Sequence, residues 1–116
     1  MKRFLTIVLV LIGLTTFAQS KNAKSTIEVD GVCGMCKERI EKACLKTKGV
    51  KMANWNRETH ELNLIYDERK TNLKTIQENI AAVGHDTPEF KATDEAYNSV
   101  APCCKYRDEE VVKSHH

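Results

Sequence analysis

The sequence is poor in the residues that mark non-globular chains. It contains 5 glycines and 2 prolines in 116 residues, too few for a collagen-like or low-complexity chain. Its formal net charge is only +2, and the excess lies in Lys2 and Arg3. No basic run follows them, so the chain lacks the electrostatic pattern of a nucleic-acid binder or of a protein that binds anionic membranes. A hydrophobic content of 41% excludes a disordered polymer, and the length predicts a single domain.

Uninterrupted apolar sequence is confined to the N-terminus, at Phe4–Leu14. Two basic residues precede this segment, and small residues occupy positions −3 and −1 of a cut after Ala18, as in secretory signals. A membrane-spanning helix needs about 20 apolar residues, so we predict a cleaved signal at 1–18 rather than an anchor. The mature chain is then periplasmic or secreted, has no stable membrane insertion, and lies in an oxidising compartment.

After a polar lead-in at 19–25, the hydrophobic pattern alternates between strand and helix periods. Strand patterns occur at 26–30, 50–55, 62–66 and, weakly because of Pro88, 85–91. Helical patterns begin at Cys36 and at Leu73 and are stopped by Gly49 and Gly84. The order β-α-β-β-α-β predicts an α+β, ferredoxin-like fold, with an antiparallel four-stranded sheet and two helices on one face. Residues 92–116 follow as a tail, with a short helix at 93–99 and a mobile end from Asp108.

The most informative chemistry is the motif Cys33-Gly34-Met35-Cys36. Its two thiols lie on a loop and on the first turn of a predicted helix, where free N–H groups and the helix dipole stabilise thiolate. Thiolates are the ligands that soft metals prefer. By spacing alone the pair also fits a structural disulfide, a redox dithiol or half of a zinc site.

The residues around this motif resemble the heavy-metal-associated domain family, over 26–91. That family includes small copper chaperones, mercury-binding periplasmic proteins and the N-terminal modules of metal-pumping ATPases. The helix reads RIEKAC where the family has RIEKAL, and three further matches are Gly49-Val50, Tyr66-Asp67 and Gly84-His85. Gly31 stands where the family usually has a buried Met that steadies the loop.

The resemblance implies a carrier and not an enzyme. A surface loop would bind one soft ion through Cys33 and Cys36 and pass it by ligand exchange to a metal-transporting membrane protein or another carrier. Cu(I) is favoured, because Val32 stands where zinc-handling relatives often have Asp; Hg(II) and Zn(II) are the alternatives. In this fold His85 lies beside the metal loop, where it is either a third ligand or hydrogen-bond donor to a thiolate, or an ordinary exposed loop histidine.

The tail carries two more candidate ligands, Cys103 and Cys104. Lys105 and Arg107 beside them form an electropositive setting that favours thiolate. If the tail folds back, two extra thiolates turn a two-coordinate site into a closed three- or four-coordinate one. The alternatives are a vicinal or an intermolecular disulfide. Cys44 lies on the apolar stripe of its helix and is expected to be a core residue.

Three functions are consistent with these residues. The leading one is an exported carrier or scavenger of a soft metal ion. The alternative is a thiol–disulfide oxidoreductase in which Cys33 attacks and Cys36 resolves, although the strand–helix order is wrong for a thioredoxin plan. A third is a non-catalytic module whose cysteines only staple a small core.

Overall fold

The computed structural model describes residues 19–114. The predicted signal segment, residues 1–18, lies outside the described residues. Within 19–114 the strands form a three-stranded antiparallel sheet in the order β1-β3-β2, comprising β1 (Ala23–Glu28), β2 (Val50–Trp55) and β3 (Glu61–Tyr66). The central strand β3 alternates exposed residues with buried Leu62, Leu64 and Tyr66, which face the core.

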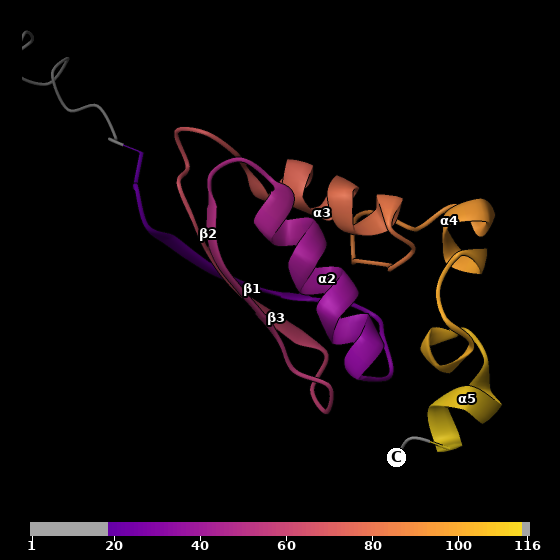
Figure 1. Cartoon of the computed structure of the whole chain (residues 1–116). Helices are drawn as coiled ribbons and strands as arrows, with labels where there is room; N and C mark the ends of the chain where they lie inside the picture. The colour runs from indigo at the N-terminus through magenta and orange to yellow at the C-terminus, as the bar shows by residue number, and fades with distance from the viewer. Residues whose placement is uncertain (1–18, 115–116) are drawn as a thin grey trace, which may run out of the picture.

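Two helices, α2 (Gly34–Lys46) and α3 (Leu73–Ala82), lie side by side on one face of this sheet (Figure 1). Their inward residues stand at i, i+4 spacing, which places both members of each pair on one helix face. Ile40 and Cys44 of α2, and Ile76 and Ile80 of α3, are completely buried. Burial of each large aliphatic side chain contributes roughly 1.5–3 kcal/mol, so this layer is the main source of stability.

The fourth strand predicted at 85–91 is not formed, so the prediction of a four-stranded sheet was wrong for the described chain. One ladder-like bond exists, from the Asp30 N–H to the Asp86 carbonyl at 3.0 Å. Beyond it the backbone turns, because the Thr87 N–H donates to the Phe90 carbonyl at 2.8 Å and the Thr87 hydroxyl accepts from the Phe90 N–H at 3.2 Å. Pro88, inside that turn, has no N–H to offer a neighbouring strand.

The ends of the domain are more ordered than the sequence suggested. β1 begins at Ala23, before the predicted start at Thr26. Ahead of it, the Ser20 N–H donates to the Glu68 carboxylate at 2.9 Å, and the Ser20 carbonyl accepts from the Glu68 N–H at 2.9 Å. The tail forms α4 (Asp94–Asn98), within the short helix predicted at 93–99, and a 3-10 turn η1 (Pro102–Cys104). It also forms α5 (Glu109–Ser114), where a mobile end from Asp108 was expected. These elements lie at the end of the α2–α3 layer that carries the start of α2 (Figure 1).

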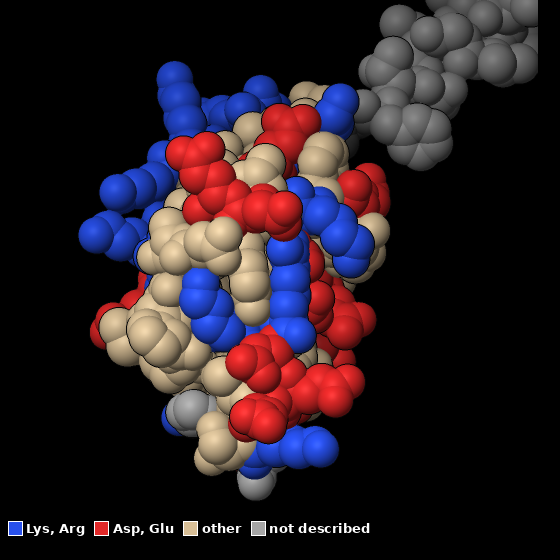
Figure 2. Space-filling model, turned by 90° about the vertical axis from the view of Figure 1, so that its right-hand side faces the viewer, with Lys and Arg blue, Asp and Glu red and all other residues tan. Residues whose placement is uncertain are grey.

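No helix within residues 19–114 is long and apolar enough to cross a membrane. On the face that carries the tail, acidic and basic side chains alternate, in agreement with the nearly balanced charge of the chain (Figure 2). This face therefore offers no large patch of one charge.

Cys44→Ala is expected to lower the free energy of unfolding by about 1 kcal/mol, because it leaves a small cavity where the sulfur is now fully buried. Burial also raises the pKa of the Cys44 thiol to about 12, so it stays protonated at neutral pH. Leu45→Ala is the matched control: that side chain is 54% exposed, and its loss should change stability by less than about 0.5 kcal/mol. Denaturant unfolding measures the free energy of unfolding of both variants. A Cys44→Ala protein as stable as wild type would contradict the core role of Cys44.

Candidate metal centre

The first two cysteines are placed by the start of α2. Cys33 is the N-cap residue, and its carbonyl accepts from the Lys37 N–H at 3.1 Å. Cys36 lies in the first turn, where its Sγ accepts from the Val32 N–H at 3.4 Å. The two sulfurs are 3.8 Å apart. Neither is on an open surface, since Cys33 is 6% exposed and Cys36 not at all.

The tail covers them and brings two more sulfurs to the same place. Cys33 Sγ lies 2.9 Å from Cys103 Sγ and 3.1 Å from Cys104 Sγ. Cys36 and Cys104, 68 residues apart, are paired as a disulfide, with Cα atoms 5.8 Å apart. We call these residues, Cys33, Cys36, Cys103 and Cys104, the four-sulfur cluster. Cys44 lies outside it, buried farther along α2.

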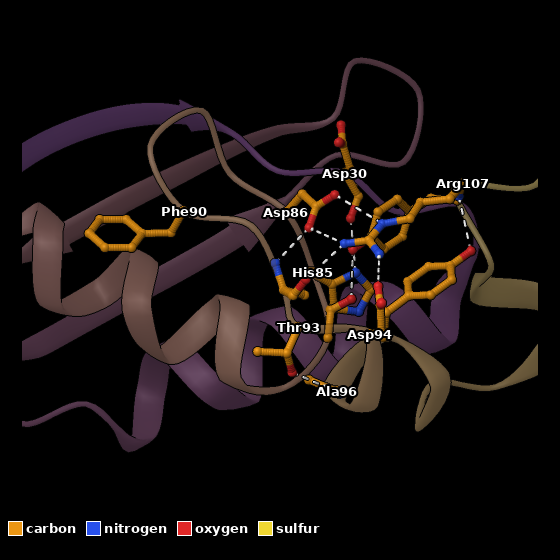
Figure 3. Close-up of polar contacts among 12 residues, drawn as sticks. Asp30, His85, Asp86, Phe90, Thr93, Asp94, Ala96 and Arg107 are labelled. Atoms are coloured by element: carbon orange, nitrogen blue, oxygen red, sulfur yellow. Dashed lines mark hydrogen bonds and ion pairs between the residues drawn. The ribbon is translucent and has the colours of Figure 1, made fainter.

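Two residues of the tail, Arg107 and Tyr106, hold it against the domain, and Figure 3 shows the contacts of Arg107. Arg107 donates to the buried carboxylate of Asp86 at 2.9 Å and to the Ala92 carbonyl at 2.9 Å, and its guanidinium lies over the Tyr97 ring at 4.3 Å. The Tyr106 hydroxyl donates to the Gly84 carbonyl at 2.8 Å. Burial acts to raise the pKa of Asp86, but the hydrogen bonds from Arg107 and Ala92 outweigh it and the pKa falls below its usual value. The carboxylate is therefore charged and paired at neutral pH.

The prediction that Lys105 and Arg107 favour thiolate in the tail was wrong for Cys103. A hydrogen bond with Cys33 raises the pKa of the Cys103 thiol, and partial burial adds to the rise. Both cations are engaged elsewhere, because Lys105 donates to the Tyr97 carbonyl at 3.0 Å and Arg107 to Asp86. They hold the tail in place rather than activating its thiols.

His85 is completely buried, so the interpretation of it as an ordinary exposed loop histidine was wrong. Its Nδ1 donates to the Asp30 carbonyl at 2.9 Å, and its ring stacks on Tyr106 with centroids 5.5 Å apart. Burial lowers its pKa to about 4, and Arg39 acts in the same direction. His85 is not among the described residues whose ligand atoms gather within 4.8 Å, which are Cys33, Cys103 and Cys104. A ligand role for His85 remains a prediction.

The loop that carries the cysteines is supported by Trp55. The indole is fully buried and donates from Nε1 to the Val29 carbonyl at 2.9 Å. A Cβ at Gly31 would lie 2.9 Å from two atoms of this indole and 3.1 Å from the Cys36 Cβ. Gly31 is thus required because Trp55 fills the space beneath the loop. The sequence gave no sign that Trp55 lies under the loop that carries the cysteines.

Sequence reasoning also missed the Asp86–Arg107 clamp. The two residues are 21 apart on irregular chain, where no periodic pattern relates them. A charged residue directly after the Gly84-His85 pair and a cation after the tail cysteines were the available signals, and neither indicates a partner.

The part of the chain that carries the first two cysteines has a recognisable family profile. The profile described as Heavy-metal-associated domain matches residues 26–86. The chain belongs to the heavy-metal-associated domain family. The matched part includes Cys33 and Cys36 and ends before Cys103 and Cys104, so half of the four-sulfur cluster comes from outside the family domain.

Among relatives of this heavy-metal-associated domain protein, the Copper-exporting P-type ATPase of Bacillus subtilis (strain 168) is 33% identical over 91 residues. That match covers 78% of this chain and only 11% of the ATPase. The structure named CopZ metallochaperone aligns with a TM-score of 0.55 at 29% identity, covering 56% of this chain and 98% of CopZ. The N-terminal soluble domains of Bacillus subtilis CopA align with a TM-score of 0.54 at 34% identity, covering 60% of this chain and 48% of that structure.

Arg107→Gln should release the tail in part, because it leaves the buried Asp86 carboxylate without its main partner. If the free energy that holds the tail on the domain falls by about 1.4 kcal/mol, the fraction of molecules with an undocked tail rises about tenfold. We expect Cys36 of the reduced protein to be alkylated correspondingly faster, as followed by mass spectrometry of the Cys36 peptide. Arg69→Gln is the control and should leave the rate unchanged, because it removes the ion pair with Asp67, whose N–H donates to Gly49 beyond the C-terminal end of α2, whereas the four-sulfur cluster lies at the start of that helix. Equal alkylation rates in Arg107→Gln and wild type would show that the clamp does not hold the tail.

Lowering the pH should destabilise the fold through His85. Its pKa is about 4 in the folded chain against 6.5 as the ordinary value, so the unfolded chain binds more protons between these limits and stability falls as pH drops through them. The full loss below pH 4 is about 3 kcal/mol. His85→Gln should flatten the pH dependence of the unfolding free energy between pH 7 and pH 4.5. The same slope in variant and wild type would contradict this role.

Proposed function

We propose that this chain binds one soft metal ion in the four-sulfur cluster and carries or scavenges it outside the cytosol. The observation that carries the proposal is the meeting of four cysteine sulfurs from two distant segments, Cys33 and Cys36 on the α2 loop and Cys103 and Cys104 in the tail. Sulfur ligands alone select soft ions. Cu(I) is favoured, with Hg(II) and Zn(II) as further candidates, and the copper-exporting ATPase and CopZ among its relatives support the first.

The metal-binding form requires reduction of the Cys36–Cys104 disulfide. A two-electron donor of the dithiol class converts this bond into two thiols and is itself oxidised to a disulfide. Metal binding then displaces the thiol protons to solvent. The same cluster can therefore exist as a disulfide with two neighbouring thiols or as four thiols, and only the second offers a complete sulfur cage.

The burial of the cluster favours retention of the ion. An open two-cysteine loop exchanges its ion readily, whereas a closed site with three or four sulfurs holds it. Here Cys36 and Cys104 are at most 1% exposed, and Cys103 is the outermost sulfur of the four. We therefore favour a scavenger, or a carrier that releases its ion only when the tail moves, over a fast-exchanging shuttle.

A thiol–disulfide oxidoreductase is the second candidate, favoured by one observation. Cys33 Sγ lies 3.1 Å from Cys104 Sγ, close enough to attack the Cys36–Cys104 disulfide and release Cys36. Against turnover on another protein stands the burial of both disulfide sulfurs, which leaves a substrate no access while the tail is docked. Reduction of insulin by a catalytic amount of the chain would favour this second function.

The test is a titration of the reduced chain with Cu(I), Hg(II) and Zn(II) in competition with a chelator. Cys33→Ser should weaken Cu(I) binding more than about 100-fold. The loss of a residue that only hydrogen-bonds to a metal ligand already lowers metal affinity about 10–100-fold, and Cys33 is itself a proposed ligand. Cys103→Ser/Cys104→Ser should retain binding but transfer Cu(I) to the chelator faster, and X-ray absorption should count fewer sulfur ligands. Cys44→Ala is the matched cysteine control and should behave as wild type.

Two results would contradict the proposal. Tight Cu(I) binding by Cys33→Ser would remove the α2 loop from the site. Identical sulfur counts and transfer rates with and without Cys103 and Cys104 would limit the site to the two loop cysteines.

A further inference from the structure

Met35 has no packing role that explains its place inside the cysteine motif. It is 57% exposed, the most exposed of the large apolar side chains described. The Cys103 thiol donates to its Sδ at 3.7 Å, so its thioether faces the tail thiol rather than the core. Together with the tail it lines a cleft of about 250 Å³ that reaches Cys104; the other lining residues are Glu38, Arg39, Lys42 and Ala101.

The sulfur atoms form a continuous line from solvent to the interior. Met35 Sδ is 3.7 Å from Cys103 Sγ, which is 2.9 Å from Cys33 Sγ, which is 3.1 Å from Cys104 Sγ. Exposure falls along this line, from 57% at Met35 through half-buried Cys103 to 6% at Cys33 and 1% at Cys104. An ion that enters at Met35 thus meets a new sulfur at each step inward.

The chemistry of a thioether suits the outer position. It is neutral and carries no proton to displace, so it can bind a soft ion before any thiol has ionised. It does not form disulfides, so it remains a ligand in an oxidising compartment where exposed thiols pair. Thioether sulfur selects Cu(I) and similar soft ions and is a poor ligand for Zn(II), which prefers thiolate, imidazole and carboxylate.

We infer that Met35 and Cys103 form a capture site that takes a soft monovalent cation from solution and passes it to Cys33. The inference rests on the proposed function of the four-sulfur cluster. Each step exchanges one ligand: the bond to Met35 Sδ breaks as the bond to Cys33 Sγ forms, and the displaced thiol proton leaves to solvent. No electron is transferred. Met35 thereby adds selectivity for soft ions during uptake.

Ag(I) is the probe, because it is soft, monovalent and stable in water without a reductant. The reduced full chain is compared with Met35→Leu, a volume-conserving change at an exposed position. Met52→Leu is the matched control, since Met52 is 39% exposed on the sheet, in a hollow lined by residues that contribute no cysteine. Stopped-flow uptake should be slowed about tenfold in Met35→Leu, a barrier change of about 1.4 kcal/mol, and unchanged in Met52→Leu. Zn(II) uptake should be equal in all three.

A second measurement catches the ion at the capture site. The double variant Cys33→Ser/Cys104→Ser removes both inner thiols that neighbour Cys103, at 2.9 Å and 4.0 Å, so Ag(I) should remain at Met35 and Cys103 and shift the Met35 methyl resonance, while the Met52 methyl resonance stays in place. An equal Ag(I) uptake rate in Met35→Leu and wild type, or no Met35 methyl shift in this double variant, would overturn the inference and leave the four-sulfur site intact. Failure of the wild-type reduced chain to bind Ag(I) at all would overturn the proposed function as well.

Discussion

The arrangement of the cysteines depends on the ion pair between Arg107 and Asp86. A carboxylate that is almost fully buried is costly unless a cation compensates it, and here that cation comes from the tail. Without the tail, the Asp86 carboxylate would lack the cation that Arg107 supplies, so the ion pair favours the docked position of the tail. Because Arg107 follows Cys103 and Cys104 closely, docking of the guanidinium also fixes where these sulfurs lie.

The consequence is a site made from two sources. The family domain supplies Cys33 and Cys36 on a loop supported by Trp55, and the segment beyond the matched region supplies Cys103 and Cys104. Where an open loop would leave two sulfurs facing solvent, the tail here covers them. If the cluster holds an ion as proposed, an acceptor would have to displace thiols that the same chain holds close to it, and the high effective concentration of these thiols would slow exchange.

Features that depend on local pattern could be predicted from the sequence, such as the buried Cys44 and the stop of the second helix before Gly84, because the residues of one element determine them. The pattern at 85–91 failed as a strand because turn contacts replaced the ladder bonds, a competition that single-residue preference does not reveal. Contacts between segments far apart in the sequence could not be predicted from local pattern. The sequence left open whether the tail folds back to the α2 loop, because only specific contacts such as the Tyr106 hydrogen bond select that conformation. The burial of His85 also involves the tail, because its ring stacks on that of Tyr106.

The Cys36–Cys104 connection has one more consequence, which concerns protein lifetime. Any link between these residues, a disulfide or a shared ion, joins positions 68 apart in the sequence and closes a loop that contains β2, β3 and α3 but not β1. Closing a loop of that size removes chain entropy from the unfolded ensemble worth about 4 kcal/mol. On the proposed function, the reduced, metal-free chain is then the least stable form and the one that proteases degrade fastest, so proteolysis would selectively remove reduced, empty molecules and spare those that are loaded or disulfide-bonded.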